Sequence, residues 1–282
     1  MTIETISEQS CFSGVQGFYR HASQETGGAM KFGVFRPALT AQAKAPVLYY
    51  LAGLTCNEET FAIKAGAQRL AAELGLILVT PDTSPRDTGI EGATGDWEFG
   101  EGAGFYVDAT SPAFAQQFRM YSYVTHELPA ILRANFAVAD TSRESIFGHS
   151  MGGHGALTIA LKNPARYRSV SAFAPIVAPS GVPWGQKALP RYLGEDRAIW
   201  RQYDTCALIA EGARFPGEIL VDQGGGDKFL DTQLQPEQLE RACADAGQPL
   251  NLRRHADYDH SYWFIQSFVA DHLQHHAQAL HR

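Results

Sequence analysis

A serine flanked by glycines lies near the middle of the chain, in the stretch Gly148–Gly152 (GHSMG). This G-x-S-x-G pattern is typical of a nucleophilic Ser150 on a sharp turn between a strand and a helix. An apolar strand is predicted before it at Ser145–Phe147, and a helix rich in small residues after it at Gly152–Lys162. The alternative is a plain glycine-rich turn with a capping serine. The strand and the helix on either side favour the nucleophile.

A serine needs a neighbouring base to attack at neutral pH, and two histidines lie between the helix Gly152–Lys162 and the final helix. His260 is predicted in the turn between a strand and the last helix, from which its side chain can reach across the sheet edge to Ser150. His255 ends the preceding strand and is the weaker candidate, with a solvated strand-end position as its alternative. We therefore expect His260 to be the base.

The histidine in turn needs a carboxylate that orients it, and the order expected on this scaffold is serine, acid, histidine. Asp222 lies within or at the end of a predicted strand, whereas Asp227 follows three glycines that let the loop turn back over the site. We prefer Asp227. Asp259 is adjacent to His260 in sequence, and we expect it at the surface or at a helix N-cap.

An acyl-transfer site also needs two N–H donors for the oxyanion. One is predicted at the Met151 backbone, directly after the serine, and the other at Leu54, in the loop that follows the strand Val47–Leu51. Cys56 lies two residues further on. It is predicted either to line the pocket or to be a small buried hydrophobe, and no nucleophilic role is expected for it.

These residues need a scaffold, and apolar runs alternate along the chain with helical periodicity. This alternation predicts an α/β fold with a mostly parallel sheet and helices on both faces. The first 45 or so residues, with the run Phe32–Phe35, predict an antiparallel edge. We expect one domain over residues 1–282. Further strands are predicted at Leu76–Thr80, Ser169–Phe173, Glu218–Val221 and Leu250–Arg254, and further helices at Ala65–Leu74, Phe118–Phe136, Pro236–Ala246 and Tyr262–His275.

The segment from about residue 84 to 117 has many glycines and no apolar period. Long loops in compact domains are usually functional or disordered. Trp97, Phe99, Phe105 and Tyr106 make this one too apolar for disorder. The sequence therefore predicts an ordered loop packed over the sheet.

Charge and composition exclude several classes of protein. The 282 residues carry 23 Lys and Arg against 30 Asp and Glu, a net charge of −7 that argues against a nucleic-acid partner. The first ten residues resemble no secretion signal, and no stretch approaches the ~20 apolar residues of a membrane span. The four cysteines are far apart, as expected of free thiols in a reducing cytoplasm.

We expect no metal site. The C-terminal helix carries several histidines, and His272 and His276 have the i, i+4 spacing of a ligand pair. No third ligand accompanies them at a matching spacing, so a solvated helix face is the favoured interpretation.

Several stretches together resemble the S-formylglutathione hydrolase family, the esterase D branch of the α/β-hydrolases. The stretches with the most specific resemblance are Gly100–Thr110 (GEGAGFYVDAT) and Tyr258–Ile265 (YDHSYWFI). Val182 departs from the pattern, since many members carry cysteine there. The other matching stretches are Leu51–Asn57 (LAGLTCN), Lys64–Leu70 (KAGAQRL), Gly148–Leu157 (GHSMGGHGAL) and Pro183–Lys187 (PWGQK).

The resemblance implies hydrolysis of S-formylglutathione to glutathione and formate, in formaldehyde detoxification, with side activity on small carboxylic esters. It also implies a triad of Ser150, Asp227 and His260, no cofactor, and often a homodimer. A general carboxylesterase acting on acetyl or sugar esters is the alternative enzyme, and a non-catalytic binding module is a third interpretation.

Substrate contacts are expected from four further residues. Trp97 and Trp184 are predicted either to wall the pocket or to serve only in packing. Glutathione carries two carboxylates and the chain is acidic, so recognition must be local. Lys64 or Lys187 is predicted to offer a cation at the pocket mouth, with solvated surface lysines as the alternative. The acidic loop around Asp96 would meet the substrate's ammonium group.

Overall fold

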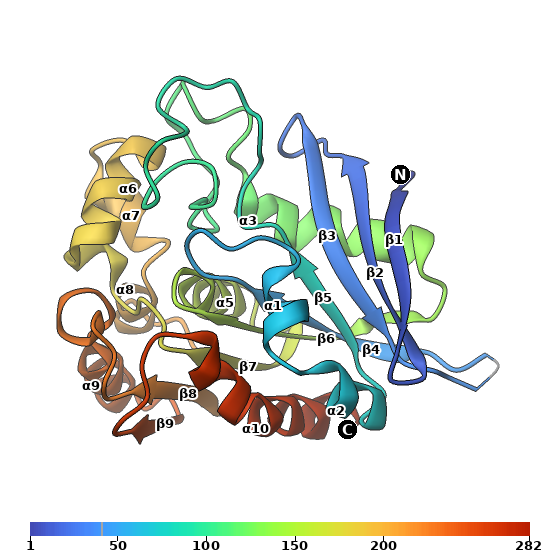
Figure 1. Cartoon of the computed structure of the whole chain (residues 1–282). Coiled ribbons are helices and arrows are strands. Elements are labelled where there is room, and N and C mark those ends of the chain that lie inside the picture. The colour runs from blue at the N-terminus through green and yellow to red at the C-terminus, as the bar shows by residue number, and fades with distance from the viewer. Residues whose placement is uncertain (41) are drawn as a thin grey trace.

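A nine-stranded sheet forms the centre of the computed structural model, which describes residues 1–40 and 42–282 (Figure 1). The strand order is β1-β2-β3-β5-β4-β6-β7-β8-β9. The strands from β5 to β9 are parallel, and β1, β2 and β3 extend the sheet as an antiparallel edge, as predicted. The strands are β1 (Glu4–Cys11), β2 (Gly14–Ala22), β3 (Ala29–Arg36), β4 (Ala45–Leu51), β5 (Ile77–Pro81), β6 (Ala139–His149), β7 (Tyr167–Phe173), β8 (Ile219–Gly224) and β9 (Leu250–His255).

Helices cover both faces of this sheet. The helices α2 and α10 lie against one face, and α4 and α5 lie against the other (Figure 1). The α-helices are α1 (Thr60–Lys64), α2 (Gln68–Glu73), α3 (Met120–Ser122), α4 (Leu128–Asn135), α5 (Met151–Lys162), α6 (Pro183–Leu193), α7 (Arg197–Arg201), α8 (Thr205–Ala210), α9 (Pro236–Ala246) and α10 (Tyr262–Leu280). Shorter turns of other helix types are η1 (Tyr123–Glu127), η2 (Pro179–Gly181) and η3 (Leu230–Leu234).

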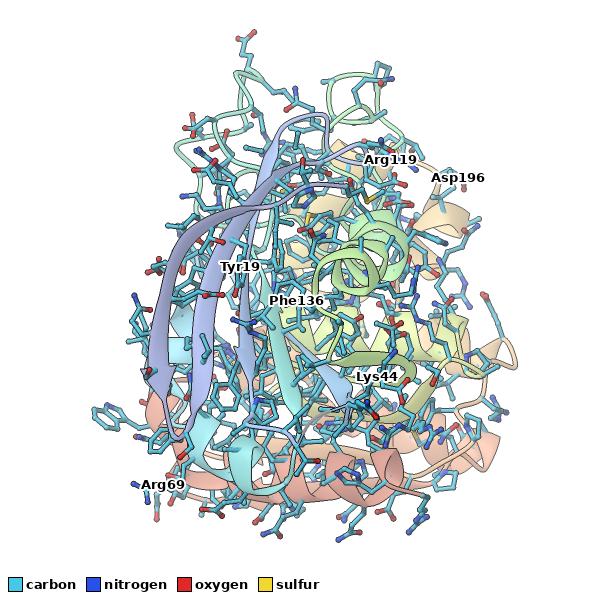
Figure 2. The ribbon with its side chains drawn as sticks, turned by 90° about the vertical axis from the view of Figure 1, so that its right-hand side faces the viewer. Tyr19, Lys44, Arg69, Arg119, Phe136 and Asp196 are labelled. Carbon is cyan, nitrogen blue, oxygen red and sulfur yellow. The ribbon has the colours of Figure 1, made fainter. Side chains whose placement is uncertain are left out.

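The neighbouring central strands β4 and β5 are largely apolar because both of their faces are covered. Every residue of β4 and of β5 is buried. The antiparallel edge is tied to the helical layer by aromatic packing, with the rings of Tyr19 and Phe136 perpendicular and 5.1 Å apart (Figure 2). None of the helices in the described residues is long and apolar enough to cross a lipid bilayer.

Strand register brings the predicted site together. Leu51 pairs with Gly148, so the loop after β4 starts beside the serine that follows β6. Gly224 pairs with His255, so the loops after β8 and β9 leave the sheet side by side. In a parallel sheet these carboxyl ends share one edge, which is where ligand sites form.

The long segment between β5 and α3 is ordered and packed, as predicted. Phe99, Phe105 and Tyr106 are fully buried, whereas Trp97 is half exposed. The helix predicted over residues 65–74 is shorter in the structure: α2 begins only at Gln68, because Gly66 adopts a left-handed conformation that separates it from α1.

Candidate active site

Ser150 occupies a strained turn between β6 and α5. Its backbone has φ 57° and ψ −119°, a conformation that residues with a side chain rarely adopt. The glycines on either side make the turn possible. A methyl group on Gly148 would lie 2.2 Å from the Gly152 carbonyl oxygen, and one on Gly152 would lie 1.9 Å from the Leu51 carbonyl oxygen. This is the geometry expected of a nucleophile held at a strand-to-helix elbow.

His260 and Asp227 form a hydrogen-bonded pair. The ring Nδ1–H donates to Asp227 Oδ2 over 2.5 Å, since a carboxylate can only accept. The other carboxylate oxygen accepts the Phe229 amide at 2.8 Å, which fixes the acid in place. The Asp227 side chain is fully buried. With Nδ1 occupied, the other ring nitrogen of His260 is the one that can act as a base.

The competing acid and base have other partners. Asp222 Oδ1 lies 2.6 Å from Arg253 Nε, and Asp222 Oδ2 lies 3.3 Å from His272 Nε2. Burial raises the pKa of Asp222, but the bonds from His272 and Arg253 outweigh it and hold that pKa well below its usual range. His255 stacks on Phe268 at 3.7 Å, so it is packed rather than solvated. The structure joins Asp227, and not Asp222, to His260.

Ser150 and His260 line one cavity of about 260 Å³. Of the residues predicted from sequence, Leu54, Cys56, Lys64, Trp97 and Trp184 line the same cavity. Its remaining lining residues are Gly53, Thr55, Thr60, His149, Phe229 and Tyr262. Burial raises the pKa of the Cys56 thiol, which keeps it protonated and unreactive near neutral pH.

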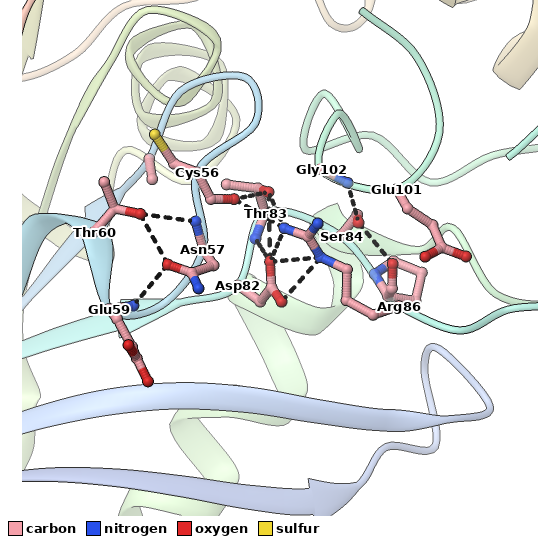
Figure 3. Close-up of polar contacts among 12 residues, drawn as sticks. Cys56, Asn57, Glu59, Thr60, Asp82, Thr83, Ser84, Arg86, Glu101 and Gly102 are labelled. Atoms are coloured by element: carbon pink, nitrogen blue, oxygen red, sulfur yellow. Dashed lines mark hydrogen bonds and ion pairs between the residues drawn. The ribbon is translucent and has the colours of Figure 1, made fainter. Parts of the chain in front are cut away.

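The loop after β4 is anchored by polar contacts from the segment after β5 (Figure 3). The Cys56 carbonyl oxygen accepts from Thr83 Oγ1 at 2.7 Å and from Arg86 Nη2 at 2.9 Å. Arg86 is itself paired with the buried Asp82 at 2.7 Å. The Thr55 amide donates to the Gly102 carbonyl at 2.9 Å. These contacts fix the backbone that carries the Leu54 amide.

Within the described part of the chain, neither the Leu54 nor the Met151 amide donates a hydrogen bond to another residue. Buried amides are almost always paired, so two free amides next to a serine nucleophile are available for a ligand oxygen. This is the arrangement that an oxyanion site requires.

Aromatic side chains from three segments wall the cavity near His260. The Trp97 and Trp184 rings are perpendicular with centroids 5.8 Å apart, and Phe229 lies 4.6 Å from Trp184 and 5.1 Å from His260. The indole Nε1 of Trp184 donates to Glu98 at 2.8 Å. Sequence reasoning missed Phe229, although it follows Asp227 by only two residues.

The two predicted lysines differ in their surroundings. Lys187 does not line the cavity, and its Nζ lies 2.8 Å from Asp96 and 2.6 Å from Glu98. The cation predicted at Lys187 and the acidic loop predicted to meet an ammonium group therefore neutralise each other. Lys64 does line the cavity, with its Nζ 5.8 Å from the Tyr262 ring centroid.

His149 is a site residue that sequence reasoning missed. It is the residue before Ser150, and its ring lies 4.4 Å from that of His260. Burial, helped by the nearby His260, holds the pKa of His149 well below its usual range, so the ring stays neutral. Neither of its nitrogens has a hydrogen-bond partner among the described residues. Its place inside the G-x-S-x-G motif was the available signal.

The expectation of a solvated histidine face on the last helix is wrong for two residues. His272 and His276 are fully buried and lie 2.7 and 2.8 Å from Ser171 Oγ. The helix turns this face toward the sheet, where serines of β7 provide polar partners. No group of three or more metal-binding side chains occurs among the described residues.

The fold and the site together define a class: an α/β-hydrolase with a buried serine at the elbow and a histidine–aspartate pair beside it. A family model described as a putative esterase matches residues 23–275. Two S-formylglutathione hydrolases each cover 99% of this chain and are covered to 99% in turn. The enzyme of Paracoccus denitrificans (strain Pd 1222) is 51% identical over 280 residues, and that of Rattus norvegicus is 49% identical over 281.

A solved structure of an S-formylglutathione hydrolase from Agrobacterium tumefaciens superposes with a TM-score of 0.95 at 51% identity. It covers 98% of this chain and 99% of its own. The chain belongs to the S-formylglutathione hydrolase family of esterases.

Proposed function

We propose that the chain is a serine thioesterase that hydrolyses S-formylglutathione to glutathione and formate in formaldehyde detoxification. Small carboxylic esters are expected to be side substrates. The observation that carries this proposal is the shared cavity of Ser150 and the hydrogen-bonded pair His260–Asp227. The name of the Agrobacterium tumefaciens enzyme, with its matching fold, supports the choice of substrate.

The proposed mechanism has two acyl-transfer steps. Ser150 Oγ attacks the formyl carbon while the free ring nitrogen of His260 takes its proton, and the amides of Leu54 and Met151 stabilise the oxyanion. The C–S bond then breaks, and glutathione leaves as its thiol after His260 returns the proton. In the second step His260 activates water, which attacks the formyl-serine ester and releases formate. Asp227 stabilises the imidazolium in both steps.

The cavity supports a small acyl group. Its volume of about 260 Å³ is below the ~300–1,000 Å³ typical of drug-sized ligand sites. The aromatic wall of Trp97, Trp184 and Phe229 limits the space beside His260. An enzyme can discriminate between two substrates that differ by one methylene by only ~1–3 kcal/mol. On the acyl side, specificity therefore comes mainly from excluding acyl groups larger than formyl.

The test is removal of the nucleophile. We expect Ser150→Ala to lower kcat with S-formylglutathione by about 10⁶-fold, the order found when a triad serine is lost. Thermal unfolding should show that the variant is folded. Hydrolysis at the wild-type rate would reject Ser150 as the nucleophile and leave a non-catalytic module as the better description.

The choice of substrate has its own measurement. For the wild-type chain, we expect kcat/KM with S-formylglutathione to exceed that with an aryl acetate by orders of magnitude. A ratio near one would reject the glutathione assignment in favour of a general carboxylesterase acting on acetyl or sugar esters.

A cytoplasmic location and a homodimeric state are further parts of the proposal. The four cysteines are unpaired thiols, as expected in a reducing compartment. Sedimentation of the purified chain would give its mass in solution, and a monomer at micromolar concentration would reject the dimer.

A further inference from the structure

A second hollow adjoins the catalytic cavity. It has a volume of about 640 Å³ and lies between α1 and the start of α10. We call it the flanking groove, and its lining residues are Ile63, Lys64, Ser261, Tyr262, Trp263 and Gln266. Two of them, Lys64 and Tyr262, also line the cavity that holds Ser150. The two hollows are therefore adjacent, with Lys64 and Tyr262 at their junction.

The groove exposes large apolar side chains. Trp263 is 75% exposed and Ile63 is 69% exposed, the two highest values among the large hydrophobic residues that the structure describes as exposed. Isolated exposed hydrophobics are common, but two in one hollow beside a catalytic cavity mark a binding surface. Their flat and branched faces suit the backbone and methylene groups of a peptide.

The groove also carries an available cation. Lys64 makes no ion pair with any described residue, whereas Lys187, on the other side of the cavity, is paired with two carboxylates. Both hydroxyls of the groove already have partners: Ser261 Oγ donates to Asp259 at 2.6 Å, and Tyr262 Oη lies 3.3 Å from Tyr50 Oη. An exposed, unpaired ammonium group at the junction of two hollows is complementary to a carboxylate.

We propose that the flanking groove binds the glutathione part of the thioester. Lys64 pairs with one of its carboxylates, and Ile63 and Trp263 pack against its peptide chain. This inference rests on the proposed function. It extends that function by placing the leaving group, glutathione, on the side of the cavity next to α1 and α10. It also explains how an acidic protein accepts an anionic substrate, since the cation is placed where the substrate's charge lies.

The first test compares two formyl thioesters that differ only on the thiol side. S-formylglutathione carries both carboxylates, and S-formyl-N-acetylcysteamine carries none. We expect Lys64→Ala to lower kcat/KM for S-formylglutathione about tenfold more than for the uncharged thioester, with Lys64→Arg restoring most of the difference. Lys44→Ala is the matched control, because Lys44 is exposed and precedes β4 at the opposite end of that strand from the site (Figure 2). Equal losses for both thioesters in Lys64→Ala would overturn the pairing.

The second test removes the apolar surface. We expect Trp263→Ala to raise KM for S-formylglutathione at least fivefold and to lower the ratio of its kcat/KM to that of the uncharged thioester. An unchanged ratio would overturn the groove, and if sedimentation also showed loss of a dimer, the surface would be an interface between two copies. Failure of the proposed function would be seen in a different measurement: the wild-type chain would show no preference for S-formylglutathione over an aryl acetate.

Discussion

Two aspartates five residues apart serve different purposes, and conservative substitutions separate them. Asp227 contacts His260 at the cavity, so Asp227→Asn should lower kcat by about 10⁴-fold, the order seen when a triad aspartate becomes an amide. Asp222→Asn should leave far more activity, because its carboxylate contacts Arg253 and His272 instead. The measurement is kcat with S-formylglutathione for both variants. The reverse order would move the catalytic acid to Asp222.

The same pair of variants should differ in stability in the opposite sense. Both carboxylates are fully buried, but of the two only Asp222 is paired with an arginine, Arg253, so Asp222→Asn should cost about 3–5 kcal/mol in the free energy of unfolding at pH 7. Because the folded-state pKa of Asp222 is depressed, this stabilisation is complete above pH ~4 and is lost only as pH falls below that value. Asp227→Asn should unfold nearly as the wild type does in urea. A similar loss of stability in both variants would contradict this division.

The loop after β4 illustrates how one element positions another. Arg86 holds the Cys56 carbonyl, two residues beyond the Leu54 amide, and is held in turn by Asp82 (Figure 3). We expect Arg86→Ala to release the loop and lower kcat about 10–100-fold for thioester and aryl ester alike, less than the ~10²–10³ for loss of an oxyanion donor. Steady-state kinetics on both substrates measures this effect.

A matched control for that variant is Arg69→Ala on α2. Arg69 is exposed and its guanidinium lies 4.9 Å from the Phe12 ring centroid, away from the loop (Figure 2). It should keep wild-type kcat. If Arg86→Ala changed only KM, or only thioester hydrolysis, the anchoring role would be refuted, because an oxyanion donor acts on every acyl substrate.

Local sequence patterns predicted those elements whose ends are marked by characteristic residues. The helix expected over Pro236–Ala246 has those same bounds, because Pro236 at its first turn and Gly247 after it mark both ends. The elbow at Ser150 was also predictable, since only glycines fit beside it. By contrast, helix α6 was missed. Its internal Pro190 favours a break on local grounds, and burial of Trp184 and Leu189 against the core outweighs it.

The burial of the two histidines of α10 could have been predicted from the helical period of that segment. Ile265, Val269 and Leu273 step along one face, and His272 and His276 follow the same period. Their partners Ser169 and Ser171 lie in a buried strand and are distant in sequence. A single sequence does not show such pairings, because they depend on how the helix packs on the sheet. The same limit applies to the contact of His149 with His260.

The net charge of the whole molecule and the charges beside the cavity affect the binding of an anionic substrate differently. A net charge of −7 repels an anion at long range, whereas paired groups such as Lys187 with Asp96 contribute little to the local field. Salt screens exposed charges beyond about 10 Å, so near-physiological ionic strength weakens the global repulsion more than a contact at Lys64. The proposed pairing of Lys64 with glutathione is therefore less sensitive to the net charge of the molecule than to charges beside the cavity.

Acid stability of the whole fold should depend on histidines that are buried without charge. His154 on α5 donates from Nε2 to the Phe105 carbonyl at 2.9 Å and so ties the helix to the long loop. Burial lowers its pKa to about 4. Between pH ~6.5 and 4 the unfolded chain binds a proton that the folded chain does not, so stability is complete above pH 6.5 and falls with decreasing pH.

His154 alone should lower the free energy of unfolding by up to about 1.4 kcal/mol for each unit that the pH falls, and by about 3 kcal/mol in total at pH 4. Urea unfolding of the wild type, His154→Gln and His126→Gln between pH 7.5 and 4.5 measures it, with the exposed His126 as the matched control. The His154→Gln curve should be flatter with pH than the wild-type curve, because a glutamine amide can donate to the same carbonyl without titrating. The His126→Gln curve should run parallel to the wild type. Equal slopes for all three proteins would show that His154 takes up its proton in the folded state, and the contact between α5 and the long loop would not limit acid stability.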